Sequence, residues 1–132
     1  RDAFAGESVP SQLRTLEFAS QCHRVLREGG LLLANSAHGG SDNARIDLAG
    51  MRESFADIQA LCDPKVGRGA RRGNIVFLAQ YSPQSVNEAE LDRLLRKLPL
   101  PARPLRGKDL SKWQAGARAM SDAEIGWGID EA

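Results

Sequence analysis

Hydrophobic residues recur along the chain with periods that change from segment to segment, and each period predicts a secondary-structure element. Residues 11–28 show helical spacing, and Pro10 before them and Gly29–Gly30 after them suit the start and the stop of a helix. The apolar positions of this predicted helix are Phe18, Cys22, Val25 and Leu26. Residues 31–35 (LLLAN) are short and almost wholly apolar, so they predict a strand buried on both faces. A helix, a Gly-Gly stop and a buried strand together indicate the second half of a βαβ unit.

The middle of the chain predicts two strands joined as a hairpin. Residues 36–45 are polar and rich in glycine, which predicts a loop, and residues 46–53 are a short helix candidate. Residues 55–61 alternate loosely and residues 74–80 (NIVFLAQ) are more continuously apolar, so both are expected to be strands. The basic, glycine-rich residues 64–73 would connect them through a loop longer than most hairpin loops.

The last third of the chain predicts two helices. Ser85 and Asn87 are competing N-cap residues for the first of them, each followed three positions later by a glutamate. The apolar face of this helix is formed by leucines 91, 94, 95 and 98, and the prolines that follow end it. Residues 108–120 predict the second helix, which would present Leu110, Trp113 and Ala117, and the acidic residues 121–132 are expected to fray.

Composition and charge exclude several classes of protein. The 132 residues suit one domain, and 18 basic against 17 acidic side chains leave a formal charge of +1. That balance argues against a dedicated binder of nucleic acid or of anionic membranes, which would need an excess of Lys and Arg. Unbroken apolar stretches such as residues 31–34 and 75–79 are far shorter than the ~20 residues that cross a bilayer. Two cysteines, Cys22 and Cys62, cannot build a disulfide framework, so the sequence favours a reducing, cytoplasmic setting.

The sequence lacks the pattern of a glycine-rich nucleotide-binding loop. Gly39–Gly40 follows a predicted strand, but it has neither the Gly-x-Gly-x-x-Gly spacing nor the acidic residue ~20 positions further on, so it predicts a flexible turn. The chain also begins at Arg1 without an initiator Met, in what reads as the middle of a fold. We therefore expect a piece of a longer protein, with any nucleotide loop upstream of it and no activity in the piece alone.

The opening of the chain carries a more specific pattern. Residues 2–18 (DAFAGESVPSQLRTLEF) align without a gap with Asp-Ser-Ser-Asp-Pro-x-Gly-Pro-x-x-x-Leu-Phe-Thr-x-Glu-Phe, the pattern of spermidine synthases. Residues 71–79 and 98–110 are similar to later segments of the divergent bacterial spermidine synthase-like group, and residues 25–35 resemble the segment that leads into the fifth strand of class I methyltransferase-like folds. The chain thus resembles the spermidine synthase-like (polyamine aminopropyltransferase) family over most of its length.

This resemblance implies a fold class and a domain organisation. It implies an α/β protein that forms the C-terminal half of a doubly wound, Rossmann-like methyltransferase fold with an antiparallel final hairpin. In that arrangement residues 74–80 insert antiparallel between residues 31–35 and residues 55–61. Residues 1–105 would form the C-terminal half of the catalytic domain, and residues 106–132 would form a C-terminal helix and tail.

The resemblance also implies an activity, which is the transfer of an aminopropyl group from decarboxylated S-adenosylmethionine to a polyamine. The implied ligands are a small polyamine and decarboxylated S-adenosylmethionine or S-adenosylmethionine itself, without a metal. The implied assembly is a possible homodimer, with no nucleic-acid partner and no membrane contact for this segment.

The implied site lies at the start of the chain. By the resemblance, the nucleotide would contact Asp2, Ala3, Phe4 and Pro10, and the substrate would contact Glu7 and Leu13. Asp2 matches the first carboxylate of the family pattern and is the candidate catalytic residue. The family's second Asp, which binds the attacking amine and accepts its proton, is replaced by Ala5. A methyl group can do neither, although the nearby Glu7 could supply a substitute carboxylate.

Two rival functions therefore stay open beside aminopropyl transfer. One is an S-adenosylmethionine-dependent methyltransferase of the same fold. The other is a catalytically inactive homologue that acts as a binding module, which Ala5 favours directly.

Other polar residues are better explained by structure than by chemistry. Lys65, Arg68, Arg71 and Arg72 predict a solvated hairpin tip, because no aromatic residues lie between them for base stacking. Neither histidine has metal-ligand spacing with a cysteine: His23 is expected on a helix surface, and His38 in a loop after a strand, where a catalytic role is an alternative. Cys22 is expected to be a small core residue, and Trp113 a packing anchor for the last helix.

Overall fold

The structure is a computed structural model, and it describes residues 1–2, 6, 8–100 and 102–126. Its elements, in chain order, are η1 (Ser11–Leu13), α1 (Leu16–Val25), β1 (Leu31–His38), α2 (Ala44–Arg52), β2 (Asp57–Cys62), α3 (Pro64–Gly67), β3 (Gly73–Gln80), α4 (Glu88–Arg96), β4 (Arg103–Leu105) and α5 (Gly107–Gln114). Within the described residues, no helix is long and apolar enough to cross a membrane.

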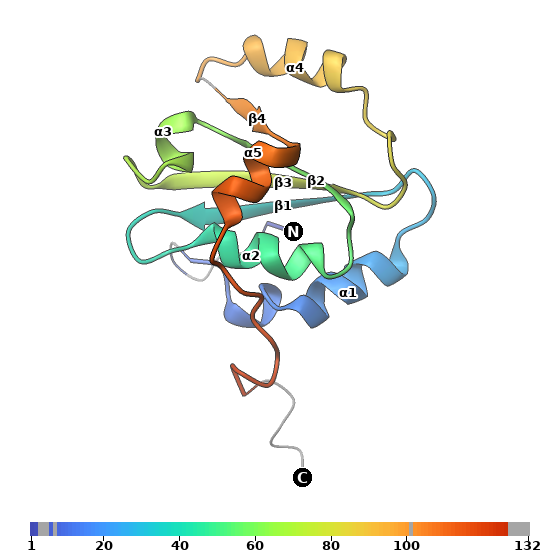
Figure 1. Cartoon of the computed structure of the whole chain (residues 1–132), viewed down its shortest axis with the longest axis vertical. Helices are drawn as coiled ribbons and strands as arrows, with labels where there is room; N and C mark the ends of the chain where they lie inside the picture. The colour runs from blue at the N-terminus through green and yellow to red at the C-terminus, as the bar shows by residue number, and fades with distance from the viewer. Residues whose placement is uncertain (3–5, 7, 101, 127–132) are drawn as a thin grey trace.

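The four strands form one sheet in the order β1-β3-β2-β4, and all neighbours are antiparallel (Figure 1). β3 lies between β1 and β2, with Phe77 opposite Ala34 on one side and opposite Ala60 on the other. The sequence-based expectation that residues 74–80 insert between the two other strands is confirmed, as is the antiparallel hairpin.

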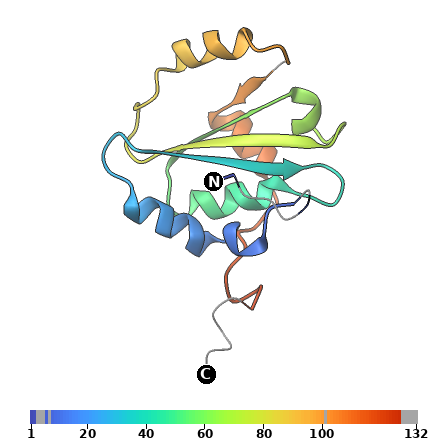
Figure 2. The same ribbon diagram turned by 180° about the vertical axis from the view of Figure 1, so that it is seen from behind.

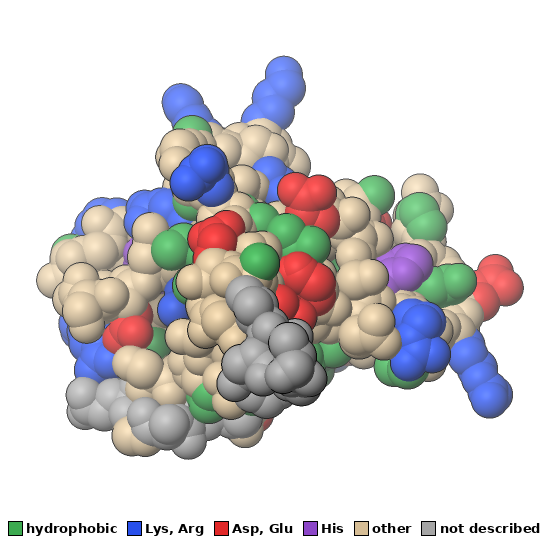
Figure 3. Space-filling model, turned by 90° about the horizontal axis from the view of Figure 1, so that it is seen from below, with side chains coloured by type: hydrophobic (Ala, Val, Ile, Leu, Met, Phe, Trp, Pro, Cys, Tyr) green, Lys and Arg blue, Asp and Glu red, His purple; other side chains and the backbone are tan. Residues whose placement is uncertain are grey.

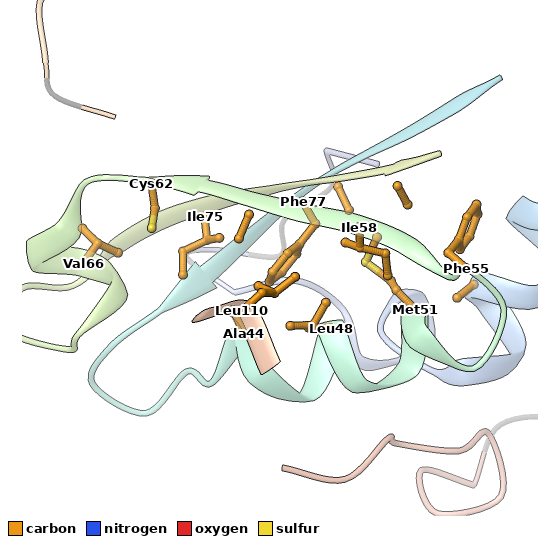
Figure 4. Packing of buried hydrophobic residues seen from close by; sticks show 14 residues of the cluster. Ala44, Leu48, Met51, Phe55, Ile58, Cys62, Val66, Ile75, Phe77 and Leu110 are labelled. Atoms are coloured by element: carbon orange, nitrogen blue, oxygen red, sulfur yellow. The ribbon is translucent and has the colours of Figure 1, made fainter. Parts of the chain in front are cut away.

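The hydrophobic core lies between this sheet and the helices on one of its faces. α2 packs against β1 and β3, α5 packs against β2 and α2, and α1 lies beside α2 (Figure 1). Side chains from the sheet and from α2 and α5 meet there, among them Leu48, Met51, Ile75, Phe77 and Leu110 (Figure 4). Leu110 is fully buried, so α5 is part of the domain core rather than an appendage.

The opposite face of the sheet is more open. Leu32 and Ala34 of β1 join the core, so by strand alternation Leu31 and Leu33 point the other way, where they are 40% and 51% exposed. In Figure 2, β1 and β3 lie in front with α5 behind them, and α4 stands above the sheet next to β4. Among the described residues no helix covers β1 on this side.

The first helix is shorter than the sequence predicts. Residues 11–13 form a 3-10 turn instead, and α1 begins after Thr15, whose hydroxyl accepts a hydrogen bond from the Phe18 N–H at 3.2 Å. The main-chain N–H of Leu16 is bound to Met120 O at 2.8 Å, so a contact from the far end of the chain fixes this break. Val25 is 66% exposed, and Ala19 is the buried residue of α1. Val25, one of the apolar residues at helical spacing, therefore does not pack in the core.

β1 is longer than the predicted strand, because polar residues continue it. Ser36 and His38 were expected in a loop, yet both are buried in β1 and both have hydrogen-bond partners that compensate for burial. The predicted connection 64–73 contains α3, and the proline-rich segment contains β4, neither of which the periodicity indicates. α5 ends at Gln114 rather than at residue 120.

The helix after β3 begins at the second of its two candidate caps. Asn87 is the N-cap of α4, and its side-chain oxygen accepts from the Glu90 N–H at 3.0 Å. Ser85 instead donates to the Ser82 carbonyl at 2.7 Å. Leu95 is buried against the domain, whereas Leu94 and Leu98 are each 50% exposed.

Candidate functional site at the outer edge of β1

The candidate site begins where Arg1 pairs with the outer edge of β1. The Arg1 carbonyl accepts from the Asn35 N–H at 2.8 Å, and the Arg1 main-chain nitrogen donates to the Leu33 carbonyl. These two bonds follow the hydrogen-bond pattern of a parallel strand, so Arg1 lies beside β1 as a residue of a parallel strand would. Asp2 follows immediately, so its carboxylate is presented at the edge of the sheet.

The Asp2 carboxylate is exposed and is oriented by Asn35. The Asn35 Nδ2 group donates to Asp2 Oδ1 at 3.2 Å. The other polar atom of this amide, Asn35 Oδ1, is buried and has no hydrogen-bond partner among the described residues. A buried acceptor costs free energy until a donor reaches it. The exposed Asp2 carboxylate therefore offers acceptor oxygens to a donor such as an ammonium group, whereas Asn35 Oδ1 is buried.

A buried charge network holds this edge in place. The Asp47 side chain on α2 is only 3% exposed. Its carboxylate accepts from Arg1 Nη2 at 2.9 Å, from Arg14 Nε at 2.7 Å and from Ser36 Oγ at 2.7 Å. Burial lowers the pKa of the Arg1 guanidinium, and the Asp47 carboxylate opposes that effect. The network joins Arg1, the strand β1 and the segment before α1 through one carboxylate.

The remaining site residues are placed around this network. Leu13 and Arg1 line the same small cavity, which at about 20 Å³ holds one water molecule rather than a substrate. Pro10 precedes η1, and its carbonyl accepts from the Leu13 N–H at 3.0 Å. Ser8 is tied to Asp42, in the turn between β1 and α2, by a hydrogen bond of 2.9 Å.

Four of the predicted site residues cannot be compared with the structure. Ala3, Phe4, Ala5 and Glu7 lie outside the described residues. The structure brings together Arg1, Asp2 and Asn35, and it leaves the contribution of the other predicted residues as an expectation.

His38 has a structural role rather than the catalytic role considered above. It is 2% exposed, its Nδ1 accepts from the Ala44 N–H at 3.1 Å, and its ring lies 5.3 Å from that of Trp113. Burial, and next the charge of Arg45, lower the pKa of His38. The imidazole is thus a neutral group that receives the first free N–H of α2.

Two arginines of the connection 64–73 and the other histidine, His23, also have structural contacts. Arg71 pairs with Asp63 at 2.6 Å, and Arg72 pairs with Asp42, which supports the interpretation of residues 64–73 as a solvated tip. On the face seen from below in Figure 3, basic side chains are spread around the rim and acidic ones lie between them. The His23 ring contacts those of Phe55 and Tyr81, with centroids 5.0 and 4.8 Å away, so it is not the free surface residue that was expected. Cys22 is half-buried, and Cys62 is the cysteine that lies in the core.

Sequence reasoning missed the residues that hold the site. Asp47 occupies a core-facing position of α2, three residues after Ala44 and four before Met51, where an apolar side chain is the norm. A carboxylate at such a position is itself a signal, because a buried charge needs partners. Nothing in the local sequence identifies Arg1 and Arg14 as those partners. Within the described part of the chain, no group of three His, Cys, Asp or Glu residues could hold a metal ion.

Comparison with known proteins gives one informative match. The chain is similar to the crystal structure of a probable spermidine synthase from Corynebacterium glutamicum, with a TM-score of 0.78 and 32% sequence identity. The match covers 92% of this chain and 46% of that protein, so the chain spans about half the length of its structural neighbour. No family model matches the chain, and no curated protein matches it. The fold is therefore spermidine synthase-like, and the sheet and helices form part of a methyltransferase-like α/β fold.

Proposed function

We propose that this chain supplies the amine-binding wall of a spermidine synthase-like transferase. The observation that carries the proposal is the exposed Asp2 carboxylate, oriented by Asn35 beside β1 in a fold similar to that of a probable spermidine synthase. The proposed reaction is aminopropyl transfer from decarboxylated S-adenosylmethionine to a small polyamine, in the cytoplasm. The proposed enzyme is a homodimer that needs no metal.

The chemistry explains why a carboxylate belongs at this edge. An aliphatic amine is a cation at neutral pH, because the pKa of such a group, as in the lysine side chain, is about 10.4. Asp2 would attract and orient the ammonium group, and the hydrogen bond from Asn35 Nδ2 would hold the carboxylate in position for it. After the amine loses a proton, its nitrogen attacks the aminopropyl carbon bonded to the sulfonium sulfur. The carbon–sulfur bond then breaks, and the sulfur leaves as a neutral thioether.

Ala5 limits this proposal in a definite way. The deprotonation step needs a proton acceptor within hydrogen-bond reach, and the resemblance places that acceptor where this chain has Ala5. Glu7 is the proposed substitute. If it does not act, the protein is an inactive homologue that still binds a polyamine, which is the second candidate function. A methyltransferase of the same fold is the third, and it would not need Asp2 to bind an amine.

The test is polyamine product formation by the protein at its natural full length, with decarboxylated S-adenosylmethionine and putrescine. Loss of a positioned general base lowers a rate by about 100- to 10,000-fold, so unless Glu7 replaces that base we expect negligible transfer by the native protein and a gain with Ala5→Asp. Asp2→Asn in the Ala5→Asp background should abolish that gain, whereas Glu28→Gln, at an exposed glutamate in the turn after α1, should not.

The outcomes separate the candidates. Robust native turnover that Glu7→Gln removes would assign the base to Glu7 and exclude the inactive homologue. Putrescine binding that Asp2→Asn weakens, without turnover in any variant, would support the binding module. If no variant binds putrescine and no variant forms product, the proposal is contradicted.

A further inference from the structure

A second cavity lies at the sheet edge opposite to Asp2. It has a volume of about 330 Å³, it is partly open to solvent, and the residues that line it come from β2, β4, α5 and the region of α3. Its walls are formed mainly by the apolar groups of Cys62, Pro104, Leu105 and Trp113. This volume is at the lower end of the range of small-molecule sites, so it suits a compact ligand of one or two rings.

The aromatic wall of this cavity is fixed before any ligand binds. The Trp113 Nε1–H donates to the Gly67 carbonyl at 2.6 Å, which sets the angle of the indole. The Arg45 guanidinium lies 4.7 Å from the ring centroid, and Arg45 Nε donates to the Trp113 carbonyl at 2.6 Å. A wall that is already ordered loses little conformational entropy when a ligand packs on it.

Two arginines give the cavity a charge preference. Arg68 on the α3 side and Arg103 on the β4 side both line it, and both are exposed. Neither guanidinium forms an ion pair with a side chain in the described ranges, whereas Arg71 and Arg106 nearby are each paired with an aspartate. Two unpaired guanidinium groups beside an apolar cavity complement an anionic group attached to an apolar body.

We propose that this cavity binds a small aromatic carboxylate. The aromatic ring packs against Trp113 and Leu105, where stacking and burial of apolar area stabilise it. The carboxylate lies toward Arg68 and Arg103, which can bind its two oxygens with charge-assisted hydrogen bonds. The charge of this ligand is opposite to that of a polyamine, so the site is distinct from the one at Asp2 and does not depend on the function proposed for it.

The first test compares two probes of nearly the same shape, one a carboxylate and the other its neutral amide. Indole-3-acetate and indole-3-acetamide are titrated into the ¹⁵N-labelled chain, and the Trp113 Nε1–H signal, assigned with Trp113→Phe, is followed by NMR. We expect a saturable shift with the acid and at least about tenfold weaker binding of the amide, as loss of a charge-assisted hydrogen bond requires. Equal affinities for the two probes, or no shift with either, would overturn the proposal.

The second test assigns the charge preference to these two arginines. Arg68→Gln with Arg103→Gln should weaken binding of indole-3-acetate by about tenfold or more. The matched control is Arg27→Gln with Arg96→Gln, which removes the same net charge from exposed positions in the segment after α1 and on α4 and should leave the affinity unchanged. Because all four positions are exposed, both double variants should keep the native unfolding midpoint. Equal weakening by both would mean that only net charge matters, and the site would be rejected.

Discussion

At the scale of single residues, the position of Asp2 at the outer edge of β1 depends on another carboxylate, that of Asp47. Asp47 lies inside the domain and binds Arg1, the residue directly before Asp2. It also binds Arg14 and Ser36, so three segments meet at its two oxygens. The position of Asp2 is therefore set by the interior of the protein rather than by its own surroundings.

Asp47→Asn should destabilise the fold strongly. The change removes the negative charge between two guanidinium groups whose side chains are 6% and 17% exposed. Breaking a buried ion pair by removing one partner costs about 3–5 kcal/mol. Urea unfolding at neutral pH measures the loss, with Glu28→Gln as the exposed control that should leave the free energy of unfolding unchanged. A loss below about 1 kcal/mol, the range of surface pairs, would contradict a buried network.

His38 should make the stability depend on pH. Burial lowers its pKa in the folded protein below the ordinary value of 6.5, and the charge of Arg45 adds to that shift. Below pH 6.5 the unfolded chain therefore binds more protons than the folded one, so the free energy of unfolding falls as the pH falls from about 7 toward 5.

The measurement is urea unfolding at several pH values in that window. His38→Asn keeps an acceptor for the Ala44 N–H but does not titrate, so it should flatten the pH dependence. An unchanged slope in His38→Asn would assign the effect to another group.

Single residues were also the scale at which the sequence predicted least. The resemblance identified Asp2 from its place in a motif, and the structure shows it exposed and bound by Asn35. Asp47, Arg14 and Ser36 are separated by 33 and 11 residues along the chain, so their meeting depends on the tertiary fold. Local periodicity contains no information on such contacts.

At the scale of elements, the helix caps decide where the elements begin. α4 has two candidate N-caps in the sequence, and only Asn87 accepts from an N–H of the first turn. α1 likewise begins at its cap, Thr15, although the apolar periodicity extends back to residue 11. Periodicity thus predicted which segments are helical, and hydrogen bonds of the caps set the limits.

Asn87→Ala should destabilise the protein by about 1 kcal/mol, the usual effect of removing an N-cap side chain. Ser85→Ala is the matched control, because Ser85 donates to the Ser82 carbonyl outside α4 and should have a smaller effect. Thermal unfolding of both variants measures the difference. The reverse order of the two losses would assign the cap to Ser85.

Elements without a periodic signal were the ones missed. β4 has three residues and contains Pro104, and its partner is residues 60–62 of β2. α3 has four residues and is defined by the cap at Asp63, whose side chain accepts from the Lys65 N–H at 2.9 Å. Segments this short span little more than one period of the strand or helix pattern, so only their tertiary contacts identify them.

At the scale of the whole molecule, the sheet has one edge that combines apolar side chains with free main-chain groups. β1 is the first strand of the order β1-β3-β2-β4, and Arg1 is the described residue that pairs with its outer side. Leu31 and Leu33 are 40% and 51% exposed on the same strand. Exposed apolar strand edges favour pairing with another chain.

We therefore expect the 132-residue chain to self-associate as its concentration rises. Leu33→Lys should weaken the association, because a charge at an edge strand opposes pairing. Leu100→Lys, at a position 73% exposed and outside the sheet, is the control and should have little effect. Sedimentation velocity over a range of concentrations distinguishes these cases. A monomer at every concentration would contradict the expectation.

The order of the strands has a consequence for how the chain is made. β1 and β2 are not neighbours, and β3, which joins them, is the third strand to leave the ribosome. Until residue 80 has emerged, β1 has no described partner strand beyond Arg1, and α2 has no complete sheet on which to bury Leu48 and Met51. Closing the β1–β3 pair also requires contacts between residues 31 and 80, a separation that slows folding. Within the described residues, the β1–β3 and β2–β3 pairs therefore form only once a single late strand is available, and until then the apolar sides of β1, β2 and α2 lack the sheet that buries them.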